Sequence, residues 1–128
     1  MKNFIELNLT DIEKINIREF IPYTESAIQK EIETAGNNEA IIKAGKDNLC
    51  FLEDIADAIK TDTVTEDNLI HLIKLLEDYL HKTGDKTKEV LTNGTQWEKE
   101  KHNALLRDYN DNIGLLKNCL YNSNTQGE

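Results

Sequence analysis

The chain has 128 residues, with 15 basic and 24 acidic side chains and a net charge of −9. Hydrophobic residues make up 38% and charged residues 30%, a composition typical of a polar folded domain rather than a disordered chain. An acidic chain repels phosphate, so we expect no direct binding of nucleic acid. Apolar runs all fall short of the roughly 18 residues that span a membrane. The N-terminal residues lack the apolar core of a secretory signal, so we expect a cytoplasmic protein that does not bind membranes.

The N-terminal third predicts two short helices. Residues 4–9 alternate weakly between apolar and polar, which is typical of an extended arm or an edge strand. Thr10 and Glu13 have capping-box spacing, and we expect the helix that they start to end before Pro22, because the residue before a proline is disfavoured in helical geometry. A second helix is expected from Thr24 to about Ala35.

Residues 38–60 have the apolar spacing of a third helix. Gly45 lowers the helix propensity in the middle of this segment, and so do Asp47 and Asn48. A break near residues 45–47 is therefore a second interpretation.

The clearest helix is predicted over residues 65–83, with a capping box formed by Thr63 and Glu66 and with Gly84 at its end. Its apolar residues cover about 220° of the helix surface: Leu69, Ile70, Leu72, Ile73, Leu75, Leu76, Tyr79 and Leu80. So wide a stripe indicates either a central helix or a flank, formed by Ile70 and Leu75, that meets another chain.

A last helix is expected to begin near Gln96, because Thr95 and Glu98 form another capping box. Residues 85–92 add a short helical turn, and residues 122–128 form a flexible polar tail. Together these patterns predict an all-α fold, an antiparallel bundle of about four main helices with a short extra N-terminal helix. Residues 1–121 are expected to form its single domain.

An acidic group lies in the second half of the helix expected over residues 38–60. Glu53, Asp54 and Asp57 lie about 100°, 200° and 140° around that helix from the apolar Leu52, so all three point outward. An outward acidic face is either a solvated surface or a docking site for a basic protein partner, because such a face speeds encounter and selects partners. We expect no metal site here: in an antiparallel hairpin Asp57 and Glu77 are offset by about 12 Å, too far to share an ion.

The segment His71-Leu72-Ile73-Lys74 resembles the His-x-x-Lys core of the histidine phosphotransfer family, small acidic four-helix bundles that relay a phosphoryl group. The resemblance covers four residues and implies that His71 carries the phosphoryl group while Lys74 stabilises its oxygens. The family usually has glycine after the lysine, whereas this chain has Leu75.

Three further residues lie in helical segments. Cys50 and Cys119 sit among apolar residues, and we expect two buried free thiols. Trp97, the only tryptophan, is either a core anchor or a partner contact.

The sequence contains no phosphate-binding loop, serine-hydrolase elbow or zinc-protease motif, so we expect no enzymatic activity and no cofactor. The prediction is a non-enzymatic protein–protein interaction module, a small acidic accessory or inhibitor protein. Its many Ile, Asn and Lys residues indicate AT-rich codons, hence a low-GC bacterium or phage. The alternatives are a histidine phosphotransfer protein and a structural homo-oligomer, and a homodimer remains open in either case.

Overall fold

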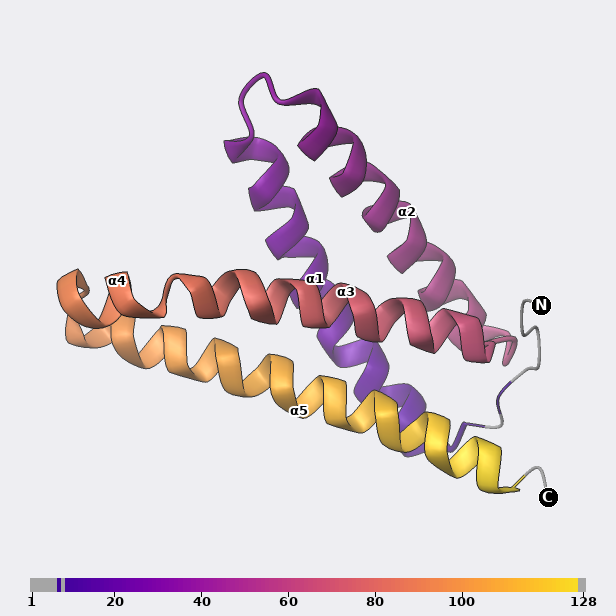
Figure 1. The fold of residues 1–128 in the computed structure, drawn as a ribbon. Coiled ribbons are helices and arrows are strands. Elements are labelled where there is room, and N and C mark those ends of the chain that lie inside the picture. The colour runs from indigo at the N-terminus through magenta and orange to yellow at the C-terminus, as the bar shows by residue number, and fades with distance from the viewer. Residues whose placement is uncertain (1–6, 8, 127–128) are drawn as a thin grey trace. The chain divides into compact units, whose positions relative to one another are not determined.

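The chain is all-α, with four long helices that pack antiparallel in two pairs (Figure 1). The computed structural model describes Leu7 and residues 9–126, with side chains as far as Tyr121. It forms two compact units, residues 1–68 and residues 69–128, and each is described by itself. None of the described helices is long and apolar enough to cross a membrane.

The first unit opens with α1, Asp11–Thr34, which corrects the prediction of a separate short N-terminal helix. The capping box of Thr10 and Glu13 forms as expected. Pro22 lies inside the helix and is exposed, although an interior proline costs about 3 kcal/mol through its missing N–H and its ring clash. The buried side chains on both sides of Pro22 lie on one continuous face, so their burial offsets that cost: Ile17, Phe20, Ile21, Thr24 and Ile28.

The second helix, α2 (Glu39–Lys60), returns antiparallel to α1 after a tight turn in which Gly36 adopts a φ of 64°. Asn38 caps its first turn by accepting a hydrogen bond from the Ile41 amide. The alternative break near residue 45 does not occur. Gly45 is buried against α1. The two helices lie so close at this point that a Cβ on residue 45 would be only 2.6 Å from Cγ1 of Ile32. The glycine that weakens the helix locally is thus the residue that lets the two helices approach.

The turn from α2 to α3 is tied to the start of the chain. Asp62 adopts a φ of 57° there, and its carboxylate pairs with Lys14 of α1. The Leu7 amide donates a hydrogen bond to the Val64 carbonyl at 2.7 Å, and both side chains are buried. Most of the extended arm expected at residues 4–9 lies outside the described residues.

In the second unit, α3 (Glu66–Asp85) packs antiparallel against α5 (Gln96–Gln126). The rings of Tyr79 and Tyr109 stack with centroids 6.5 Å apart, and Lys117 Nζ lies 3.5 Å from a carboxylate oxygen of Glu77. The residue that caps α3 lies two positions later than predicted, although the helix itself begins within one residue of the expected start. Thr65 and Asn68 exchange the capping hydrogen bonds that we expected from Thr63 and Glu66. The amide oxygen of Asn68 replaces the expected carboxylate of the capping box.

A short helix, α4 (Thr87–Asn93), precedes α5, as the sequence predicts for residues 85–92. Thr95 and Glu98 form the predicted capping box at the start of α5. None of the residues of α4 is buried, and a hydrogen bond of 2.8 Å joins the Thr87 hydroxyl to the ring of His102 on α5. His102 is itself buried, so this bond satisfies a polar ring nitrogen and anchors α4 to α5. The helix α5 continues through Gln126, over most of the segment predicted as a tail.

Candidate functional site

The candidate site is the outer face of the second half of α2, here called the acidic α2 face and defined by Glu53, Asp54 and Asp57. Leu52, Ile55 and Ile59 of the same segment are buried, with at most 3% of their surface exposed. The three carboxylates are all exposed, as their spacing around the helix predicts. Burial of one side of α2 therefore fixes the acidic side chains on the other side.

The acidic charge of the chain is concentrated in the unit that carries this face. Residues 1–68 contain seven basic and 15 acidic residues, a net charge of −8, whereas residues 69–128 contain eight basic and nine acidic residues, a net charge of −1. The field of the first unit thus adds to that of the acidic α2 face, and it attracts cationic groups beyond direct contact distance.

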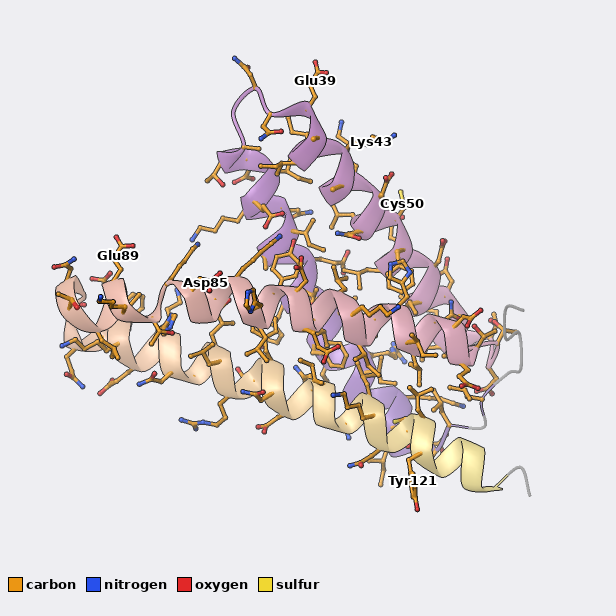
Figure 2. The ribbon with its side chains drawn as sticks, viewed as in Figure 1. Glu39, Lys43, Cys50, Asp85, Glu89 and Tyr121 are labelled. Carbon is orange, nitrogen blue, oxygen red and sulfur yellow. The ribbon has the colours of Figure 1, made fainter. Side chains whose placement is uncertain are left out.

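The outer side of α2 also carries a thiol. Cys50 is exposed, which corrects the prediction that both cysteines are buried, whereas Cys119 is 1% exposed. Figure 2 shows Lys43 and Cys50 on the side of α2 turned away from α1. One helical turn separates Cys50 from Asp54, so the thiol borders the acidic α2 face. The sequence indicates burial because the apolar residues Leu49 and Phe51 flank Cys50, but the helix places the thiol on the side of α2 opposite the buried Leu52.

The apolar flank expected on α3 is not an exposed surface. Leu75 is buried, with 7% of its surface exposed, and Ile70 is half-buried. The buried residues of α3 span about 160° of the helix surface, narrower than the apolar stripe in the sequence, because Ile70 at one edge is only half-buried. They are Leu69, Leu72, Ile73, Leu75, Leu76 and Tyr79. Of the predicted partner-binding residues, only the three carboxylates of α2 are exposed.

His71 and Lys74 are both exposed on α3, one turn apart. This position agrees with the sequence, in which His71 lies about 200° around the helix from the apolar Leu69 and is therefore expected to face solvent. Leu75, which replaces the glycine usual in the phosphotransfer pattern, is buried and so does not stand between His71 and solvent.

The acidic and histidine side chains of the described residues lie apart from one another or in pairs. Among the described residues, no three His, Cys, Asp or Glu side chains lie close enough to hold a metal ion. Glu77 lies beside Lys117 of α5, and His81 lies 3.9 Å from Asp85 on its own helix. These residues are therefore placed for pairwise contacts rather than for a shared ion.

Large apolar side chains are exposed on other helices, among them α1 and α5. Trp97 is 67% exposed, and Lys101 Nζ lies 4.9 Å from its ring centroid, so the core-anchor interpretation is wrong. Ile12, Ile15 and Tyr23 are more than half exposed and lie within about 80° of one another around α1. The apolar spacing of a helix does not by itself distinguish these residues from core residues, because it does not show which side of the helix is buried.

Comparison of the chain with models of protein families, with curated proteins and with solved structures found no match.

Proposed function

We propose that this protein is a non-enzymatic interaction module that binds a positively charged surface of a partner protein through the acidic α2 face. The observation that carries the proposal is the exposure of Glu53, Asp54 and Asp57 on one side of a helix, in a unit with a net charge of −8. Charges placed in this way accelerate association and select partners of opposite charge. Because an acidic chain repels phosphate groups, we expect neither nucleic acid nor anionic membranes to be among its partners.

The role of a small accessory or inhibitor protein follows from the same features. A short acidic chain that presents a charged helix can cover a basic surface on its partner, and so block whatever that surface binds. Because charged contacts at the rim of an interface act mainly on the association rate, we expect binding to weaken as salt concentration rises.

The test is affinity capture from a lysate of the source organism with three baits. One bait is the wild-type chain, and the second carries Glu53→Lys, Asp54→Lys and Asp57→Lys. The third is a matched control with Glu100→Lys, Asp108→Lys and Asp111→Lys on α5, where all three side chains are exposed and the change in net charge is the same.

We expect one dominant protein to bind the wild type and the α5 control but not the α2 variant. Retention of that protein by the α2 variant would contradict the proposal. Equal loss of that protein from both variants would also contradict the proposal, because binding would then depend on the net charge of the chain and not on the acidic α2 face.

The exposure of His71 and Lys74 favours a second candidate function, phosphotransfer. In that reaction an imidazole nitrogen of His71 attacks the phosphorus of a donor and forms an N–P bond, while the bond from phosphorus to the donor's leaving group breaks; with phosphoramidate as the donor, the group that leaves is ammonia. The chain is incubated with the small-molecule donor phosphoramidate and analysed by intact mass spectrometry. His71→Gln is compared with His81→Gln, because His81 is an exposed histidine on the same helix. Added phosphoryl mass that disappears only in His71→Gln supports this candidate, and no added mass in the wild type removes it.

A further inference from the structure

We draw no further inference here: the strongest candidate, the exposed apolar stripe that Ile12, Ile15 and Tyr23 form along one side of α1, carries none because nothing in the structure shows what covers it.

Discussion

Gly45 provides a sharp test of how α1 and α2 pack. An added Cβ would lie 2.6 Å from Cγ1 and 2.8 Å from Cδ1 of Ile32, distances that no relaxed contact reaches, and 3.5 Å from Cγ2 of Ile28, an ordinary contact. The obstacle to a side chain at this position is thus the end of one isoleucine. The substitution Gly45→Ala therefore brings two opposing effects.

The first effect is intrinsic. Alanine is about 1 kcal/mol more favourable than glycine inside a helix. The second is overpacking, which costs about 1–3 kcal/mol when a core side chain must shift. We expect Gly45→Ala to lower the free energy of unfolding by about 1 kcal/mol, since Ile32 is half-buried and can move only at the expense of its contacts. In an Ile32→Ala background, which lacks both colliding atoms, the same substitution should raise the free energy of unfolding by about 1 kcal/mol.

The assay is a double-mutant cycle, in which urea unfolding of the four proteins is followed by far-UV circular dichroism. The expected coupling between the two sites is about 2 kcal/mol. Equal effects of Gly45→Ala in the two backgrounds would refute the close approach of α1 and α2 at this point.

Three further predictions concern other parts of the chain. Gly114 is exposed inside α5, and no atom lies within 4 Å of an added Cβ. Gly114→Ala should therefore stabilise the chain by about 1 kcal/mol and raise Tm by about 3–5 °C in a thermal melt. An unchanged or lower Tm would contradict a helical, uncrowded position for residue 114. Thr87→Val leaves a buried ring nitrogen of His102 without its partner, at a cost of about 1–3 kcal/mol. Amides of α4 should then exchange with deuterium faster, whereas Thr87→Ser, which keeps the hydroxyl, should not change them. The hydrogen bond from Lys14 to the Asp62 carboxylate raises the pKa of Lys14 above its usual 10.5, so the stability from this pair is present below pH 10.5 and is lost as the pH rises through the raised pKa. An NMR titration of the Lys14 side chain should show a lower pKa in Asp62→Asn, and an unchanged pKa would show that the pair is absent in solution.

Much of the fold follows from local signals. The capping boxes of Thr10 with Glu13 and of Thr95 with Glu98 form at the predicted residues, and the helix over residues 66–85 lies where the apolar spacing places it. These features depend on residues within one or two turns of each other, which is the range over which propensity and capping act.

The errors arise where packing outweighs propensity. The sequence predicts that a helix ends before Pro22, and it gives a break near Gly45 as a second interpretation, yet both residues lie inside continuous helices. At Pro22 the apolar face continues on both sides, and at Gly45 the missing side chain makes room for Ile32. Intrinsic helix propensity disfavours both residues inside a helix, but the packing of the surrounding side chains determines whether the helix continues.

Some of the candidate partner-binding residues could be placed from the sequence and others could not. The outward direction of Glu53, Asp54 and Asp57 follows from their position relative to Leu52, because the buried side of α2 is unambiguous in the sequence. For α3 the apolar stripe is so wide that the sequence does not show which flank is buried, and Leu75 is covered rather than exposed. Polar residues opposite a narrow apolar stripe are thus predictable, whereas the edges of a wide stripe are not.

The most direct test of the acidic α2 face uses the thiol that borders it. A captured complex and the free chain are treated with a maleimide for a series of times, and the modification of each cysteine is followed by mass spectrometry of its peptide. The buried Cys119 serves as the internal control, since its accessibility should stay low in both samples. The account predicts that the partner slows the alkylation of Cys50 severalfold and that the α5 charge-reversal variant in complex shows the same protection. Alkylation of Cys50 at the same rate in the complex and in the free chain would contradict the placement of the partner on this face.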